Sequence, residues 1–320
     1  MRPLPPSAAL ALVVLGGAAS AAQGVVNAGL GERAGNPVLG AVVNNLGGSL
    51  LVAVGLLAVP SMRVGLGALR RSGLPWWSYL GGLGGAAIVV IATYVVPVLG
   101  VAVFTIAQVA GGSLGGLAAD RVGLAPVGRL PLTVPRVAGA LLGIAAVTLA
   151  QFGRPVGELA VGTVLIAVAG GLAVALQSAL NGRVSAAGTT AAGIAVNFAV
   201  GTPVILAVAA LVGAFAARPS WPAQWWWYGG GLLGVGIVLS LLVGVRAVGV
   251  LRTGLALVAG QLGGALLLDV LLPDGAGVRL PVLAGAALTL VAVLVAGVRR
   301  RPAIRVAPDR SAEPDGRLVG

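Results

Sequence analysis

Two pairs of side-chain amides occupy matching places in an otherwise apolar sequence. Gln23 and Asn27 lie four residues apart near the end of an apolar run, and Gln177 and Asn181 repeat the pair with the same spacing. Residues four apart face the same side of a helix, so each pair presents two amides to one neighbour. An unpaired amide in hydrocarbon costs on the order of 4–8 kcal/mol, so these groups need partners.

Two kinds of partner are open to these amides. The first is another helix, joined by interhelical hydrogen bonds worth about 0.6–2 kcal/mol each. The second is a polar solute, oriented by neutral donors and acceptors around a central cavity. The residues that we expect to bind substrate in the second case are Gln23, Asn27, Asn44, Gln108, Gln177, Asn181, Asn197 and Gln261.

The elements that carry these amides are membrane spans. The chain is 58% hydrophobic with only 9% charged residues, and a bilayer core needs about 20 apolar residues per helix. The sequence predicts an all-α integral membrane protein with ten transmembrane helices. They are expected at residues 7–27, 37–59, 76–96, 99–119, 135–151, 158–180, 190–216, 223–244, 249–268 and 281–298.

The first of these spans has a second interpretation. Arg2, the apolar stretch after it and the small residues 18–22 also resemble a secretory signal peptide. Against cleavage, removal of this span would leave the two halves of the chain unequal.

The charge of +12 reflects topology rather than a polyanionic partner. All twenty basic residues are arginine, and with a cytoplasmic N-terminus only Arg33, Arg154, Arg218 and Arg279 fall at outer ends. The positive-inside rule explains this bias, so we expect no nucleic acid and place both termini in the cytoplasm. Residues 302–320, with three prolines among mixed charges, are expected to form a disordered cytoplasmic tail.

The two halves of the chain repeat each other in register. Gln23 and Gln177 are offset by 154 residues, Asn44 and Asn197 by 153, and Asp120 and Asp269 by 149. We expect one five-span repeat at 1–152 and a second at 153–301. An odd number of spans inverts the second repeat in the membrane, an architecture that suits alternating access.

The residues that carry this register also carry a resemblance. "QGVVNAGLGERAGNPVLGAVVNNLGGS", its echo "QSALNGRVSAAGTTAAGIAVNFAVGT" and "AGQLGGALLLD" resemble the ten-span, EamA-like drug/metabolite transporter (DMT) superfamily, in particular its YdcZ-type branch. The resemblance implies a multi-pass small-molecule permease of the bacterial cytoplasmic (inner) membrane. The second half has Gln261 where the first has Gly112, so the two halves do not offer identical ligands.

Charges and glycines point to a gate and to close packing. Asp120 and Asp269 occupy equivalent span ends, so one interpretation is a gate that pairs with an arginine, and the other is a carboxylate solvated by headgroups. Shared register also favours close helix packing by eight glycines. These are Gly81, Gly85, Gly111, Gly115, Gly230, Gly234, Gly260 and Gly264.

Enzyme motifs fail on their context. Ser113 sits in a G-x-S-x-G match, but the chain has no histidine for a Ser-His-Asp triad. The absence of lysine excludes a Walker A motif, and the absence of cysteine and histidine excludes thiolate and imidazole metal ligands. We therefore expect no catalytic residue, no metal and no cofactor.

The sequence thus predicts a secondary transporter or facilitator that moves a small polar or amphipathic molecule across the bilayer by alternating access. The alternative is a non-transporting membrane subunit that stabilises or assembles a partner protein. The expected partners are lipid and a small-molecule substrate, and a homodimer remains open.

Overall fold

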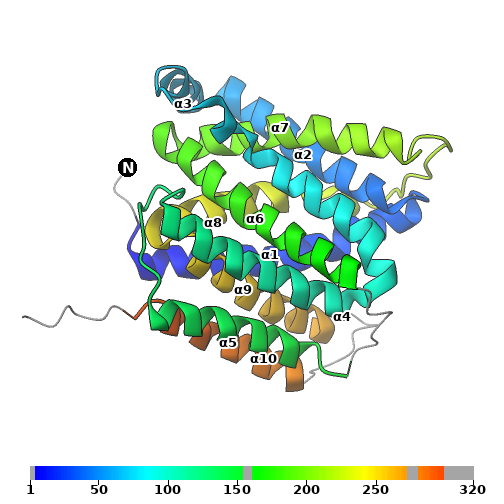
Figure 1. Cartoon of the computed structure of the whole chain (residues 1–320). Coiled ribbons are helices and arrows are strands. Elements are labelled where there is room, and N and C mark those ends of the chain that lie inside the picture. Colours follow the sequence, from blue (N-terminus) through cyan, green and yellow to red (C-terminus); the bar gives the residue numbers. More distant parts are fainter. Residues whose placement is uncertain (1–3, 154–160, 272–279, 299–320) are drawn as a thin grey trace, which may run out of the picture.

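The computed structural model describes residues 4–153, 161–271 and 280–298, and every regular element in these ranges is a helix (Figure 1). The first half contains α1 (Pro6–Arg33), α2 (Pro37–Ala58), α3 (Pro60–Arg70), the 3-10 helix η1 (Trp76–Gly81), α4 (Gly82–Val122) and α5 (Val134–Ala150). The second contains α6 (Val161–Ala187), α7 (Thr190–Leu211), the 3-10 helix η2 (Trp225–Tyr228), α8 (Gly230–Val248), α9 (Val250–Leu271) and α10 (Leu280–Ala296).

Six of the described helical segments are long and apolar enough to cross a membrane. They cover α1, α2, α6, α7, η2 with α8, and α9. Two further apolar helices, α5 and α10, have 17 residues each. These helices match eight of the expected spans in position, while the other two, at 76–96 and 99–119, fall on η1 and α4.

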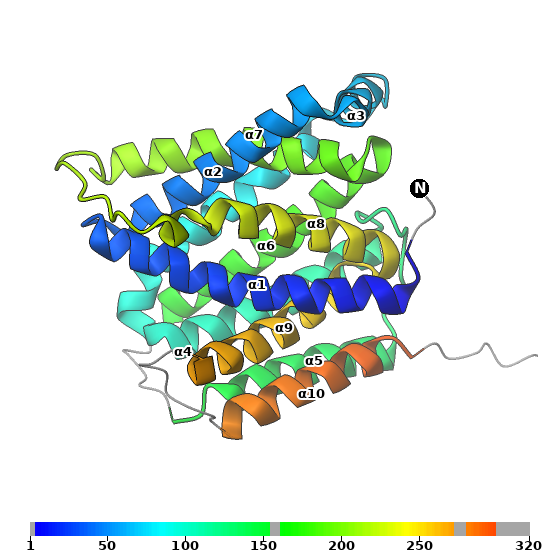
Figure 2. The ribbon, with the colours of Figure 1, turned by 180° about the vertical axis from the view of Figure 1, so that it is seen from behind.

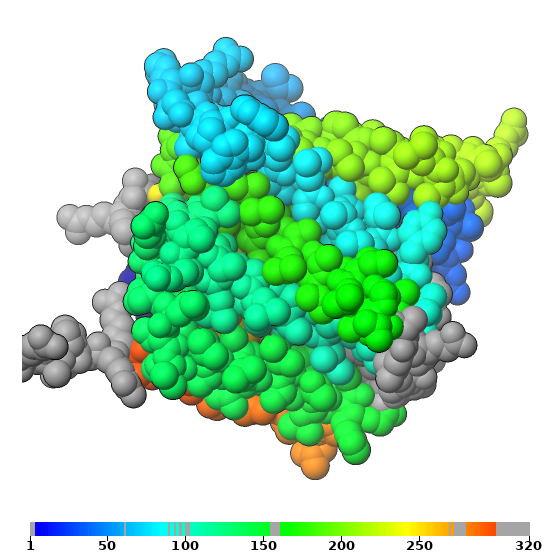
Figure 3. Space-filling model, viewed as in Figure 1, coloured from blue at the N-terminus to red at the C-terminus, as the bar shows by residue number. Residues whose placement is uncertain are grey.

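Helix α4 is continuous by its hydrogen bonds, yet it doubles back on itself. A Cβ on Gly84 would touch the carbonyl of Ala173, and one on Gly111 would touch the carbonyl of Val168. The two glycines would be about 40 Å apart along a straight helix, whereas the two α6 residues are about 8 Å apart. Figures 1 and 3 show α6 between the two arms of α4. The stretch expected to form two spans is therefore one helix with two arms.

Helix α3 is not predicted from the sequence, and it breaks the match between the halves. Its Arg63 donates hydrogen bonds to the carbonyls of Leu56 and Leu57, at 2.8 and 2.7 Å, and so caps the end of α2. A Cβ on Gly65 would lie 2.2 Å from Thr189 Oγ1, so α3 lies tightly on the α6–α7 connection. The corresponding stretch after α7, residues 212–224, forms turns and coil instead.

The same capping chemistry begins α2 and α7. Asn36 Oδ1 accepts from the amide of Val38 at 3.0 Å, and Thr189 Oγ1 accepts from the amide of Ala192 at 3.1 Å. Asn36 and Thr189 share the 153-residue offset of the repeat. Each supplies an acceptor for an otherwise unpaired amide of the first helical turn.

The packing of the halves is reciprocal. A Cβ on Gly260 of α9 would lie 2.0 Å from the carbonyl oxygen of Val14 in α1. A Cβ on Gly111 of α4 would lie 2.0 Å from the carbonyl oxygen of Val168 in α6. Because 111 corresponds to 260 and 14 to 168, these are the same contact made twice. Reciprocity of this kind defines a two-fold interface, in which each contact occurs in two copies.

The outer helix pair repeats the pattern. A Cβ on Gly139 of α5 would lie 2.8 Å from the carbonyl of Ala292, and one on Gly285 of α10 would lie 2.6 Å from that of Ala146. These four residues obey the 146-residue offset, so the register extends to the fifth and tenth helices. The start of α1 and the end of α10 lie at the same end of the bundle (Figures 1 and 2).

Candidate functional site

One amide cluster joins α1 and α2 to α8. Gln23 Nε2 donates to Asn44 Oδ1 at 2.8 Å and to the carbonyl of Gly230 at 3.0 Å. Asn27 belongs to the same cluster, because a Cβ on Gly230 would lie 2.4 Å from Asn27 Oδ1. A Cβ on Gly234 would lie 2.8 Å from Gln23 Nε2. The amides of the first half therefore pack on glycines of the second.

The other amide cluster joins α6 and α7 to η1 and the start of α4. Asn197 Oδ1 accepts from Gln177 Nε2 at 3.0 Å and from Asn181 Nδ2 at 2.7 Å. A Cβ on Gly81 would lie 2.1 Å from Asn181 Oδ1, and one on Gly85 would lie 3.2 Å from Gln177 Nε2. Here the amides of the second half pack on glycines of the first, which makes this cluster the counterpart of the other.

The two clusters show what the glycines do. A side chain at Gly81 or Gly230 would occupy the space of an asparagine oxygen, so only glycine permits the approach. The hydrogen bonds of both clusters run between helices, which is the first of the two interpretations that the sequence left open. The six amides therefore fall into two groups, and their role as substrate ligands stays a prediction.

The remaining two amides lie elsewhere. Gln261 of α9 donates through Nε2 to Ser20 Oγ of α1 at 2.9 Å. Gln108 of α4 is half-buried, and its backbone carbonyl faces Gly171 of α6, where a Cβ would lie 2.0 Å from the oxygen. Both residues lie on the close-packed pairs α1–α9 and α4–α6.

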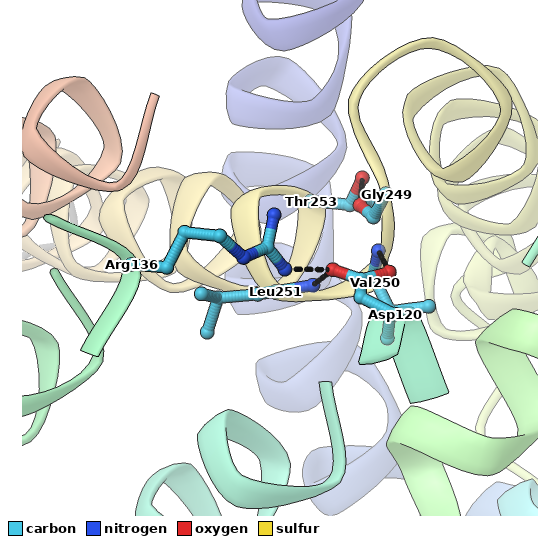
Figure 4. Close-up of polar contacts among 6 residues, drawn as sticks. All are labelled: Asp120, Arg136, Gly249, Val250, Leu251 and Thr253. Atoms are coloured by element: carbon cyan, nitrogen blue, oxygen red, sulfur yellow. Dashed lines mark hydrogen bonds and ion pairs between the residues drawn. The ribbon is translucent and has the colours of Figure 1, made fainter. Parts of the chain in front are cut away.

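The carboxylate of Asp120 is buried inside the protein and paired with an arginine of another helix. Its side chain is fully buried and forms an ion pair with Arg136 of α5, which is 7% exposed (Figure 4). Its two carboxylate oxygens also accept from the amides of Val250 and Leu251, at 2.8 and 3.2 Å. The carboxylate thus caps the start of α9, where the helix dipole favours negative charge.

The backbone around Asp120 supports this arrangement. Helix α4 ends at Val122 and is followed by Gly123, which has a left-handed φ of +74°. The amide of Leu130 then donates to the carbonyl of Asp120 at 2.8 Å. Solvation by headgroups does not fit a buried carboxylate, and the pairing with an arginine of another helix is present, but a gating role for Asp120 stays a prediction. Asp269 lies near the end of α9, and its side chain is outside the described part of the structure.

Several buried polar atoms in and near the second cluster have no partner among the described residues, and two of them, on Ser78 and Ser185, belong to residues that the sequence did not single out. Asn181 Oδ1, Ser78 Oγ and Ser185 Oγ are buried and have no hydrogen-bond partner within the described part of the chain. Ser78 lies three residues before Gly81, and Ser185 lies one helical turn after Asn181. Unsatisfied groups are costly in hydrocarbon, so this end of the bundle keeps unused capacity for hydrogen bonding.

Two cavities open on the sides of the bundle. One, of about 290 Å³, lies between α2, α3 and α7 and is lined by apolar residues with Ser49. The other, of about 370 Å³, lies between η1, α4 and α6, and Gln177 is among its lining residues. Beside it, the guanidinium of Arg183 lies 5.1 Å from the ring centre of Trp77, which also lines the cavity.

The fold and these contacts define an all-helical membrane protein built from two related halves. The chain belongs to the DMT_YdcZ family, described as "Putative inner membrane exporter, YdcZ", whose model matches residues 8–149 and again residues 162–295. This confirms the resemblance and the duplication, and it identifies the chain as a transporter-class protein of the inner membrane. Exporters of this kind are not an enzyme class.

Other comparisons add the fold alone. A crystal structure of a protein superposes with a TM-score of 0.66 at 20% identity, covering 91% of this chain and 96% of that one. No curated protein matches this chain.

Proposed function

We propose that the protein is a ten-span secondary transporter with inverted repeats at 1–152 and 153–301, and that it moves a small polar or amphipathic molecule by alternating access. The observation that carries the proposal is the exchange of amide clusters between the halves. Each half offers a glutamine and two asparagines, and each receives them on a glycine pair of the other half.

Alternating access needs two closures that are equivalent and lie at opposite ends of the site. Gln177 and Asn181 lie toward the end of α6, whereas their counterparts Gln23 and Asn27 lie toward the end of α1. With inverted halves, these positions fall on opposite sides of the membrane midplane. The two clusters are therefore suited to act as latches that open in turn.

A latch of amides has a suitable strength. Each interhelical hydrogen bond in a membrane contributes about 0.6–2 kcal/mol, so two or three of them hold a closed state without making it permanent. Released amides are also good ligands for a polar solute, since they offer both donors and acceptors. The same six side chains can thus hold the protein closed and bind substrate once a latch opens.

A second candidate rests on a specific observation. Gln23, Asn44, Gln177, Asn181, Asn197 and Gln261 all have hydrogen-bond partners within the protein. A membrane subunit that only stabilises a partner protein would also satisfy its amides internally. In that case the clusters would never open, and no solute would compete for them.

Ligand-induced stabilisation distinguishes the two candidates. Purified protein is screened for an increase in Tm against a library of metabolites and drugs, and hits are repeated on Gln177→Ala and Asn197→Ala. A transporter gives hits that shift wild type but not the variants, and the same compounds cross proteoliposome membranes only with the protein present. Equal shifts in all three proteins would reject the amides as ligands, and a library without hits or flux would favour the partner subunit.

Topology is tested separately. Reporter tags on the two chain ends should both be cytoplasmic, as expected from ten spans and from the distribution of arginine. Tags on opposite faces would overturn the inverted arrangement.

A further inference from the structure

The cavity between η1, α4 and α6 has one polar and one aromatic feature in an apolar wall. Its lining includes Leu80, Leu83, Ala87, Leu176 and Leu180, with Gln177 as the amide and Trp77 as the aromatic residue. Leu83 and Leu176 are 39% and 48% exposed, so the cavity is bordered by side chains on the outer surface of the bundle. In a membrane-spanning protein that surface contacts hydrocarbon, and the seam between η1–α4 and α6 crosses the face seen in Figure 3.

The positively charged side chain of Arg183 lies beside this cavity. Arg183 stacks on Trp77 with 5.1 Å between the guanidinium carbon and the ring centre, a distance at which the aromatic face attracts the cation. No carboxylate pairs with Arg183 among the described residues. Its charge is therefore available to an external anion, and the stacking holds it in place beside the apolar wall.

The arginine beside this cavity has no counterpart in the other half of the repeat. By the register of the repeat, Trp77 corresponds to Trp226, but Arg183 corresponds to Gly29 and Leu176 to Ala22. The other end of the bundle has a different pair, in which Arg33 lies over Trp227 at 4.1 Å. A site without a counterpart makes the two faces of the transporter unequal, as expected where a substrate is loaded from one side.

We propose that this cavity is a lateral binding site for an amphipathic anion with a single hydrocarbon tail, loaded from the leaflet on the Arg183 side. The tail lies along Leu83, Ala87 and Leu176, and the anionic head pairs with Arg183. This inference rests on the proposed function for the statement that the bound molecule is cargo.

Size and chemistry support that occupant over others. A volume of about 370 Å³ is near the lower limit of small-molecule sites, about 300–1000 Å³, which suits one tail rather than two. A free cation would be repelled by Arg183. A fully polar solute would leave the leucine side chains of the wall without an apolar group to contact. Gln177 lines the cavity and also holds the second amide latch, so an occupant lies beside the groups that must separate when the latch opens.

The test uses 11-bromoundecanoate as the probe, because bromine quenches tryptophan fluorescence only on contact. The full-length chain, with every tryptophan except Trp77 replaced by phenylalanine and its fold checked by circular dichroism, is placed in nanodiscs of neutral lipid. We expect saturable quenching that unbrominated undecanoate competes away. The trimethylammonium probe of equal length should quench at least tenfold more weakly.

Two variants locate the site, and each has a matched control. Arg183→Gln should weaken carboxylate binding about tenfold, the loss expected for one charge-assisted contact. Arg33→Gln removes the arginine of the other pair, whose Trp227 is phenylalanine in this background, and should have no effect. Ala87→Phe fills the cavity and should abolish saturable quenching, whereas Gly236→Phe, the register counterpart on an exposed position, should not.

The outcomes separate this inference from the proposed function. Equal quenching by the two probes, or quenching unchanged by Arg183→Gln and Ala87→Phe, overturns the site. Proteoliposome flux of a different compound in the absence of undecanoate binding overturns only the site and leaves the transporter in place. Saturable binding without flux of undecanoate overturns its role as cargo.

Discussion

Ser49 Oγ of α2 and Thr202 Oγ1 of α7 lie 2.8 Å apart and form a hydrogen bond. The two residues are counterparts, because they share the 153-residue offset that relates Asn44 to Asn197. A residue touches its own counterpart only where the two-fold axis passes between them. The contacts around this pair agree, since Gly48 faces Phe198 and Gly201 faces Asn45. The axis that relates the halves therefore passes near the middle of α2 and α7.

The first prediction concerns this axis. Because the chain contains no cysteine, the variant Ser49→Cys with Thr202→Cys has two thiols only. With the hydroxyls in contact, we expect a mild oxidant to close a disulfide, measured by mass spectrometry as loss of maleimide labelling. Ser49→Cys with Thr148→Cys, whose second thiol is on an exposed side of α5, should stay reduced. Two free thiols in the first variant would place the axis elsewhere.

The second prediction concerns the glycines of the two amide clusters. Gly81→Ala and Gly230→Ala each place a methyl group within 2.4 Å of an asparagine oxygen, so both should lower the Tm by several degrees. Gly24→Ala is the control, since its Cβ meets nothing within 4 Å and alanine is the better helix former. A control that loses as much stability as the two variants would contradict the role given to these clusters.

Much of this arrangement is readable in the sequence because register is conserved between the halves of one chain. The offsets that pair Gln23 with Gln177 and Gly81 with Gly230 place each residue at an equivalent point of an equivalent helix. They identify which residues correspond, and they predict that whatever one does its counterpart repeats. They do not say which residues touch, and so the two clusters and their exchange between halves were outside the reach of sequence reasoning.

Other features of the fold could not be predicted because their sequence signals are local or ambiguous. Helix α3 covers only Pro60–Arg70 and has no counterpart after α7, so the repeat gave no guide to it. Asp120 lies near the C-terminus of α4, where the helix dipole disfavours a carboxylate. This penalty is offset by backbone amides at the start of α9, 130 residues further along the chain, which donate to the carboxylate. A partner at that separation is set by tertiary packing, which composition does not encode.

The third prediction concerns the buried ion pair. Asp120→Asn leaves the guanidinium of Arg136 buried without its counter-charge, and removing one partner of such a pair costs about 3–5 kcal/mol. The double variant Asp120→Asn with Arg136→Leu should recover part of that loss, because no buried charge is left unpaired. Thermal unfolding of the single and double variants in detergent measures the coupling. Strictly additive losses would show that the two side chains do not depend on each other.

The fourth prediction concerns the break between α8 and α9. Gly249 has φ +86° and ψ 175°, a conformation accessible essentially to glycine alone. A Cβ there would also lie 2.9 Å from both carboxylate oxygens of Asp120, so an added side chain would strain the backbone and displace the carboxylate that caps α9. Gly249→Ala should therefore be more destabilising than Gly254→Ala, five residues further on, where a Cβ meets nothing within 4 Å. The backbone strain alone costs about 1–3 kcal/mol.

Combining Gly249→Ala with Asp120→Asn separates the two effects: if the methyl group acts partly through the carboxylate, the double variant loses less stability than the sum of the single losses. A Gly249→Ala protein as stable as the Gly254→Ala control would mean that the chain can rearrange at this break without loss.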